Sequence, residues 1–255
     1  MFQDLTSATR KLVASLGNAR QRRATGLFTA EGTKCIADTI NNFECRMPLA
    51  THAWLKEHAA LIPRNTCVIK ATNADLERMT QLTTATDAIA VYSLPEPPKP
   101  ADASKQLVLA LDRVQDPGNL GTIIRVADWF GIKQVVCSPE TADAYSPKVI
   151  QATMGAIARV RPLYMPLTEY IAINHGNGVF GTFLDGQNIY ETNLSPTGII
   201  IMGNEGRGIS DEVAKMVNRR LLIPSYPPGQ PTSESLNVAT ATAITLSEFR
   251  RRQIL

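Results

Sequence analysis

The sequence predicts an α/β protein of two domains. Short mixed elements fill residues 1–94, a proline-dense stretch follows at 95–104, and apolar runs alternate with helical patterns over 105–255. Such alternation favours a mostly parallel sheet with helices on both faces. The four prolines of the middle stretch favour an extended, semi-rigid linker. We therefore expect a small N-terminal α/β domain, a linker and a larger C-terminal α/β domain.

The N-terminal domain has short elements of both kinds. Two segments carry apolar residues at helical spacing, namely 12–16, which Gly17 and Asn18 would end, and 35–40. Three short apolar runs are typical of strands, at 27–30, 67–70 and 88–92.

The C-terminal domain begins with an apolar run, Leu107 to Leu111, that suits a buried parallel strand. A helix is expected next, with Ile123 and Ile124 on its apolar side and Gly131 as its stop. Ser146-Pro147 places proline at the favoured first position of another helix. Four further apolar runs predict strands, at 135–137, 179–183, 199–202 and 221–223, and a last helix is expected over 236–252.

The composition excludes several classes of protein. The 255 residues carry a net charge of only +3, and no apolar run reaches the roughly 18 residues that span a bilayer. The start, MFQDLTSATRKLV, lacks the apolar stretch of a secretory signal. The four dispersed cysteines and three histidines favour neither disulfides nor a metal site. From these observations together, we expect no metal, no membrane and a reducing, cytoplasmic location.

Three polar loops, 112–125, 203–210 and 224–237, follow predicted strands, and ligands bind at such strand ends in open α/β sheets. In the first loop, Asn119 follows a Pro-Gly turn and Arg125 lies in the next helix. Taken alone, Asn119 is better explained as a helix cap and Arg125 as a solvated helix residue, because asparagine caps are common.

The other two loops also have plain structural explanations. The glycines of MGNEGRGIS let a ligand or another backbone approach closely beside Glu205. The alternative is a glycine-rich connection with Glu205 in solvent. In the third loop, Ser235 is expected to cap the last helix, which by itself requires no function.

Together the three loops resemble the motifs of the SpoU family, also called the TrmH family, of RNA ribose 2′-O-methyltransferases. The first motif pairs an asparagine with an arginine six residues later, here Asn119 and Arg125. The second is a strand followed by GNExxG, which begins here at Gly203. The third is an Ile-Pro element followed by SLNV, here at 223–224 and 235–238.

The resemblance covers about residues 106–255, and SPKVIQATMGAIARV resembles a further family stretch. The segment ARQRRATGLFTAEGTKCIADTI resembles the small L30e-like substrate-binding domain that often precedes the catalytic one. One departure is the loop Ser225 to Glu234, which is longer and richer in proline than the usual family loop and leaves the cofactor contacts there open.

The resemblance implies S-adenosylmethionine as cofactor and a trefoil knot in the C-terminal domain. Composition and periodicity alone would indicate an unknotted sheet. The implied cofactor contacts, made largely through backbone atoms, are Thr182, Phe183, Met202, Gly203, Ile223, Pro224, Ser235 and Leu236.

The resemblance also implies roles for polar residues. Arg125 would be central, either as a general base assisted by a substrate phosphate or as the group that positions this phosphate. The pKa of a guanidinium, above about 12, favours positioning. Asn119 and Asn237 would orient the ribose and the loops, Glu205 would hold Arg125 or nearby backbone, and Ser235 would line the site.

Six Lys or Arg against two acidic residues concentrate positive charge in residues 1–34. We expect Arg20, Arg22 and Arg23 to bind RNA phosphates, with Lys11 and Lys34 as further candidates and a solvated basic face as the alternative.

The C-terminal cations and the tryptophans have structural explanations. Arg250 to Arg252 suit the C-terminal end of a helix dipole, and Trp54 and Trp129 are expected in the core or an interface. Family members dimerise through this domain. The face of the last helix formed by Leu236, Ala239, Ala243 and Leu246 is therefore expected to pack on a second copy.

The expected function is S-adenosylmethionine-dependent methylation of a ribose 2′-hydroxyl in ribosomal RNA, with transfer RNA as the closest alternative. A non-catalytic RNA-binding or ribosome-assembly protein is a second alternative, which the intact motif residues argue against. A nucleotide-dependent oxidoreductase is a third. None of the three polar loops contains GxGxxG, and no acidic residue stands at the end of the strand at 135–137, although such an enzyme would need both.

Overall fold

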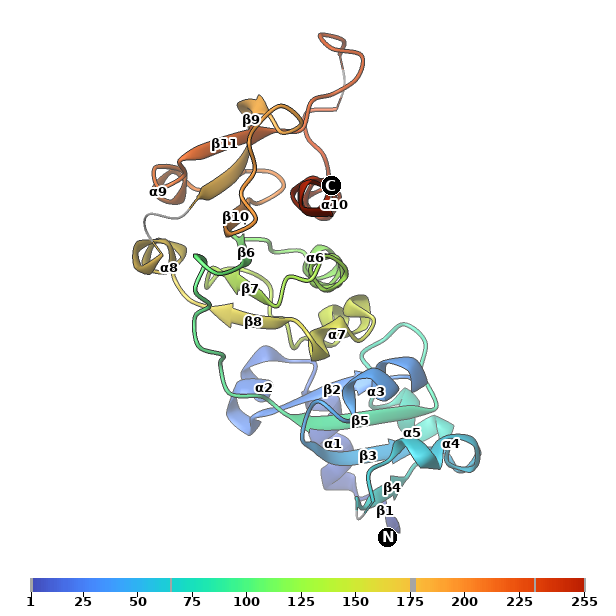
Figure 1. Cartoon of the computed structure of the whole chain (residues 1–255). Helices are drawn as coiled ribbons and strands as arrows, with labels where there is room; N and C mark the ends of the chain where they lie inside the picture. The colour runs from blue at the N-terminus through green and yellow to red at the C-terminus, as the bar shows by residue number, and fades with distance from the viewer. Residues whose placement is uncertain (1, 65, 175–177, 232, 255) are drawn as a thin grey trace. The chain divides into compact units, whose positions relative to one another are not determined.

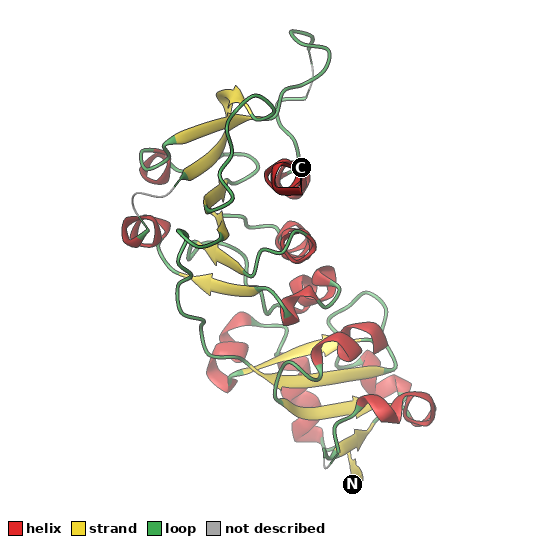
Figure 2. Ribbon diagram, in the orientation of Figure 1, coloured by secondary structure: helices red, strands yellow, loops and turns green. Residues whose placement is uncertain are grey.

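The computed structural model describes residues 2–64, 66–174, 178–231 and 233–254. The chain forms two compact units, the first of Met1–Glu96 with Asp143–Ala158 and the second of Pro97–Ala142 with Arg159–Leu255. Figure 1 follows the chain by colour, and Figure 2 distinguishes its helices from its strands. Segment 143–158 thus belongs to the first unit, although it lies in the C-terminal half of the sequence.

The first unit is built on a five-stranded mixed sheet with the order β1-β4-β3-β5-β2. β4 is parallel to β1 and β3, whereas β5 is antiparallel to β3 and β2. β2, β4 and β5 confirm the three predicted strands, and β1 and β3 are additional. The strands are β1 (Phe2–Asp4), β2 (Leu27–Glu31), β3 (Cys45–Ala50), β4 (Val68–Lys70) and β5 (Ala88–Ser93).

Polar caps begin the first two helices of this unit. The Thr6 side chain accepts from the Thr9 N–H before α1, and Asn18 accepts from the Arg20 N–H before α2. α2 ends at Gly26, whose φ of 67° favours glycine. The helices are α1 (Ser7–Ser15), α2 (Ala19–Thr25), α3 (Thr33–Thr39), α4 (His52–His58) and α5 (Asn73–Glu77), with the 3₁₀ turn η1 (Ala59–Leu61).

Segment 143–158 completes the core of the first unit. It contains α7 (Pro147–Thr153), which packs against β2, and the 3₁₀ turn η2 (Ala156–Ala158). The Tyr145 ring centre lies 5.1 Å from that of Phe28. Asp143 accepts two hydrogen bonds from the buried guanidinium of Arg22. This unit is therefore built from two distant stretches of sequence.

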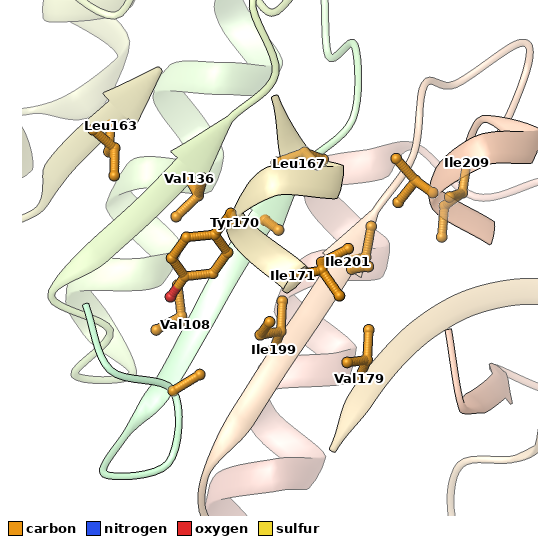
Figure 3. Packing of buried hydrophobic residues seen from close by; sticks show 13 residues of the cluster. Val108, Val136, Leu163, Leu167, Tyr170, Ile171, Val179, Ile199, Ile201 and Ile209 are labelled. Carbon is orange, nitrogen blue, oxygen red and sulfur yellow. The ribbon is translucent and has the colours of Figure 1, made fainter. Parts of the chain in front are cut away.

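The second unit contains a six-stranded, all-parallel sheet with the order β11-β9-β10-β6-β7-β8. Figure 3 shows part of its core, where Tyr170 of α8 (Leu167–Ile173) packs with Val108 and Ile199. The five predicted strands are present, and β8 is additional. The strands are β6 (Leu107–Leu111), β7 (Gln134–Cys137), β8 (Arg161–Tyr164), β9 (Val179–Asn188), β10 (Gly198–Met202) and β11 (Arg219–Leu222).

Helices cover both faces of this sheet, as predicted. Figure 1 shows α6 (Pro117–Trp129) and α10 (Val238–Ile254), which contact each other, on one face. α8 and α9 (Asp211–Ala214) lie on the other face. The last helix begins two residues later than predicted. Within the described residues, no helix is long and apolar enough to cross a membrane.

The order of the strands changes direction between β6 and β10. From β6 the chain proceeds through β7 to β8, and the later strands β9, β10 and β11 lie on the opposite side of β6. Ligands in open α/β sheets bind at the carboxyl ends of the strands at such a point. The loops that follow β6 and β10 are two of the three polar loops recognised in the sequence.

Candidate active site

The three motif loops meet at the carboxyl edge of the second sheet. Asn119 Nδ2 donates a hydrogen bond to Glu205 Oε1, and Asn237 Nδ2 donates to Asn119 Oδ1 over 2.9 Å. These residues belong to the first turn of α6, the loop after β10 and the start of α10. One residue from each motif thus joins a single hydrogen-bonded group, which we call the Asn119 cluster.

Asn119 does not cap α6. Asp116 is the cap, and its carboxylate accepts from the Asn119 backbone N–H over 2.8 Å. Pro117 occupies the first helical position, as is common after a capping residue. The capping explanation of Asn119 is therefore wrong, and its side chain is available for Glu205 and Asn237.

Asn237, rather than Ser235, caps α10. Asn237 Oδ1 accepts from the backbone N–H groups of Ala239 and Thr240 at 3.0 and 3.2 Å. The predicted capping role of Ser235 is wrong because the helix begins at Val238, which makes its neighbour Asn237 the capping residue. The Asn237 amide therefore links the start of α10 to the Asn119 cluster.

The glycine-rich loop after β10 is folded tightly on itself. Asn204 Oδ1 accepts from the N–H groups of Gly206 and Arg207, and its backbone forms a bridge with Gly208. A Cβ on Gly203 would lie 2.3 Å from the carbonyl carbon of Gly208, so no larger residue fits there without a shift. The close approach predicted for these glycines is thus between two stretches of backbone.

Arg125 stands apart from the Asn119 cluster. It lies on α6 six residues after Asn119, about one and two-thirds turns further, and is exposed. Glu205 accepts a hydrogen bond from Asn119. The predicted contact between Glu205 and Arg125 is not present in the structure. Within the described residues, Arg125 has no ion pair or hydrogen bond through its side chain, so its guanidinium is available to a ligand.

The predicted cofactor segments come from three adjacent strands. β9 lies between β10 and β11. Gly181 pairs with Ile201, so Thr182 and Phe183 begin level with Met202 at the end of β10, and residues 223–224 directly follow β11. Thr182 Oγ1 lies 3.9 Å from Met202 Sδ, which joins the β9 and β10 segments. Ser235 and Leu236 are both exposed just before α10.

Two features of the β9 segment are not evident from sequence. The guanidinium carbon of Arg220 lies 3.5 Å from the centre of the Phe183 ring, and Arg220 pairs with Asp185 at 2.5 Å. A Cβ on Gly186 would lie 2.4 Å from the carbonyl carbon of Leu221. The strand predicted at 179–183 gave no sign of this close packing, because β9 continues to Asn188 in the structure.

Sequence reasoning also missed the residues that organise the loop after β6. Asp112 is buried and accepts from the Ser210 N–H over 2.6 Å. The Asn204 side chain donates to the Arg113 carbonyl over 2.8 Å. An acidic residue that directly follows a buried strand was the available signal for Asp112.

The predicted RNA-binding arginines of α2 differ in exposure. Arg20 and Arg23 are exposed, as are Lys11 and Lys34. The Arg22 side chain is only 3% exposed, and its guanidinium donates to the carbonyls of Leu16 and Gly17 and to Asp143. The structure argues against Arg22 as an RNA-binding residue, because its donors are already engaged within the protein. The sequence did not reveal this, because Asp143 lies 121 residues away.

The C-terminal arginines have the structural roles expected of them. Arg250 Nε donates to the Phe130 carbonyl at the end of α6, Arg251 and Arg252 pair with Glu248, and Arg252 also bonds the Ile189 carbonyl.

The two tryptophans have different environments. Trp54 is buried and donates to Thr33 Oγ1 over 2.7 Å, which confirms its core position. Trp129 is 85% exposed, so it is not in the core of this chain.

The predicted dimer face of the last helix is largely covered within the chain. Ala239 is 4% and Leu246 is 0% exposed, so these two residues do not offer a free surface. Leu236 precedes the helix and is 45% exposed. Among the described residues on or directly before α6 and α10, the large apolar side chains that are exposed are Trp129 and Leu236.

Two of the four cysteines, Cys35 and Cys137, are buried. All four cysteines are free, and burial raises the pKa of the Cys35 and Cys137 thiols to about 12. No group of three or more His, Cys, Asp or Glu that could hold a metal ion occurs in the described parts of the chain.

An all-parallel sheet with this polar cluster at its carboxyl edge defines an α/β protein with a candidate ligand site built from three loops. Residues 106–247 match the SpoU rRNA Methylase family, and residues 9–90 match the MRM3-like substrate binding domain. The chain belongs to the SpoU rRNA methylase family.

Relatives that cover almost the whole chain agree with this assignment. The chain is 32% identical, over 92% of its length and 93% of the relative, to the 23S rRNA (guanosine(2553)-2′-O)-methyltransferase RlmP of Bacillus subtilis. The structure of a putative RNA methyltransferase of the TrmH family from Porphyromonas gingivalis has a TM-score of 0.88 and 42% identity, with 97% of this chain and 99% of that chain covered. An AdoMet-bound rRNA methyltransferase from Sinorhizobium meliloti has a TM-score of 0.84 and 28% identity, with 98% of both chains covered.

Proposed function

We propose that this protein transfers a methyl group from S-adenosylmethionine to a ribose 2′-hydroxyl of ribosomal RNA. The observation that carries the proposal is the Asn119 cluster, which unites all three motifs of the family at the carboxyl edge of a parallel sheet. Ribosomal RNA is favoured because relatives named for it cover 92% and 98% of the chain, whereas a structure named for tRNA covers 58%.

The residues at the edge of β9, β10 and β11 fit the cofactor. Ser210 Oγ is buried and, within the described residues, has no hydrogen-bond partner, so a polar group of a ligand can satisfy it. The segments at 182–183, 202–203 and 223–224 offer backbone amides and carbonyls at the same edge. When bound, the sulfonium cofactor supplies an electrophilic methyl group and so carries the difficult part of the chemistry.

The protein's own side chains have the task of positioning the ribose. Asn119 is held from both sides, by Glu205 and by Asn237, so its amide is fixed before the substrate arrives. Arg125 has a free guanidinium that grips the phosphate next to the reacting ribose and stabilises charge that develops there. Ser235 lines the site from the segment before α10.

The proposal extends to the organisation of the protein. Residues 1–94, completed by 143–158, form an RNA-binding domain that uses Arg20 and Arg23, and residues 95–104 form a linker. The rest of 105–255 forms the catalytic domain with the family's trefoil knot. A homodimer forms through the catalytic domain, where Trp129 and Leu236 expose apolar surface. The four free thiols suit the reducing cytoplasm.

The first test is to map ribose methylation in cellular RNA with and without this protein. We expect one 23S ribosomal RNA position to lose its 2′-O-methyl group in its absence. The purified protein should restore it with S-adenosylmethionine, and Asn119→Ala should reduce the rate about 100-fold. Asn42→Ala, a change at an exposed asparagine of the first unit, is the matched control. A folded protein that shows no cofactor binding at millimolar concentration by calorimetry contradicts the proposal.

A further inference from the structure

Arg113 occupies the centre of the carboxyl edge of the second sheet. It follows β6 by two residues, at the point where the strand order changes direction. Its N–H donates to Ser138 Oγ after β7 over 3.0 Å, and its carbonyl accepts from Asn204 after β10 over 2.8 Å. The backbone of Arg113 is therefore fixed from both neighbouring strands.

The conformation of Arg113 is unusual for its residue type. Its φ is 57°, in the left-handed region that glycine and asparagine adopt with least strain. In the described residues only one other non-glycine residue, Met154, has a positive φ. Strained residues of this kind concentrate at functional sites, so the presence of arginine here calls for a role of its side chain.

The guanidinium of Arg113 is anchored at one end and free at the other. Its Nε lies 3.3 Å from Asp112 Oδ1 and is itself buried, yet the side chain is 31% exposed. The exposed area therefore lies on other atoms of the side chain. Within the part of the chain that the structure describes, its two terminal nitrogens have no hydrogen-bond partner. Asp112 in turn is fixed by the Ser210 N–H, so it orients the guanidinium.

We propose that Arg113 is a substrate-binding residue whose two terminal nitrogens grip a backbone phosphate of the RNA near the target ribose. The inference rests on the proposed RNA substrate. A guanidinium held in one orientation suits bidentate contact with phosphate oxygens. Arg113 lies between the ends of β7 and β10, whereas the cofactor segments come from β9, β10 and β11. Phosphate of the RNA is thus favoured over the carboxylate of the cofactor.

The decisive variant is Arg113→Asn, because asparagine keeps the left-handed backbone while it removes the guanidinium. The probe is 23S ribosomal RNA from cells that lack the protein, and the readouts are kcat/KM, RNA affinity against salt, cofactor affinity and Tm. We expect kcat/KM for RNA to fall about 10- to 100-fold and the log–log salt slope to fall by about 1. Cofactor affinity should stay the same, and Tm should not fall.

Two further substitutions control for charge and for backbone. Lys105→Ala removes one positive charge just before β6, at the opposite edge of the same sheet, and should leave the salt slope unchanged. Met154→Asn relaxes the other left-handed residue and should leave RNA binding unchanged. Arg113→Lys should restore the salt slope but not the full kcat/KM, because lysine lacks the planar fork.

Three results would overturn the inference. Full activity and an unchanged salt slope in Arg113→Asn would show that no phosphate is bound there. A selective loss of cofactor affinity would assign Arg113 to the cofactor carboxylate. A large fall in Tm that Arg113→Lys reverses would make it only a partner of Asp112. If the wild-type protein binds this RNA but does not methylate it, the proposed function fails, and the salt slope still tests Arg113.

Discussion

Two helices, α2 in the first unit and α10 in the second, each carry three arginines within a short stretch. The environments of these arginines differ between the two helices. In α10 every arginine is held by the protein, through the Phe130 carbonyl or through Glu248. In α2 only Arg22 is held, and Arg20 and Arg23 on either side of it are exposed. A run of arginines therefore indicates a ligand-binding surface only where the guanidinium groups are not already hydrogen-bonded or ion-paired within the protein. Arg125 of α6 meets this condition in the second unit.

The largest effect is expected from Arg125→Ala, which removes the exposed arginine of the candidate active site. Loss of a group that stabilises developing charge typically lowers kcat by about 100- to 1000-fold. Cofactor binding, measured by calorimetry, and dimerisation should remain nearly intact. Arg125→Lys separates two mechanisms, because lysine keeps the charge without the fork. An alanine variant with full activity would show that the family motif has been wrongly assigned to this residue.

Arg22→Ala tests the buried member of the α2 run. It leaves the partly buried Asp143 and the carbonyls of Leu16 and Gly17 without their donor. We expect the free energy of unfolding of the first unit to fall by about 3 kcal/mol, measured by urea denaturation. A stable Arg22→Ala protein with weakened RNA binding would instead favour the original prediction from sequence.

The double variant Arg20→Ala with Arg23→Ala tests the exposed members. RNA affinity should fall, and the log–log salt slope should decrease by about 2, since each phosphate contact contributes about 1. Stability and cofactor affinity should not change. Arg251→Ala is the matched control from α10, where Glu248 already holds the guanidinium. Equal effects of the two changes on the slope would contradict the difference between the helices.

The smallest effect concerns the pH dependence of the α10 arrangement. The hydrogen bond from Arg251, with a further one from Arg252, lowers the pKa of Glu248 from 4.5 to about 2. A lowered folded-state pKa contributes stability above pH 4.5 that is lost as pH falls towards 2. Glu248→Gln should therefore lower Tm modestly at pH 7, and the difference from wild type should vanish near pH 2. A difference that is independent of pH would show that the ion pairs do not stabilise the helix.

The sequence predicted those parts of the fold that depend on local patterns. The apolar runs identified most strands, and Pro147 was placed correctly at the start of α7. The predicted turn at Pro117 and Gly118 is instead the beginning of α6. Asp116, followed by Pro117, carried a capping signal that could have been recognised.

Other features depend on contacts between distant residues. The burial of Arg22 depends on Asp143, the strain of Arg113 is set by the ends of two neighbouring strands, and the role of Asn237 depends on where α10 begins. No local pattern encodes these relations. The sequence therefore named candidate residues for the site, but it did not predict the hydrogen bonds that these residues form.

The discontinuous first unit determines how the protein will respond to proteolysis. The polypeptide passes between the units three times, near residues 96, 142 and 158. A protease that cuts only the proline-dense linker therefore leaves α7 on β2 and Asp143 on Arg22, both contributed by the C-terminal fragment. The two fragments should elute together as a split protein and separate only under denaturing conditions. A fragment of residues 1–96 made alone would lack part of its own core.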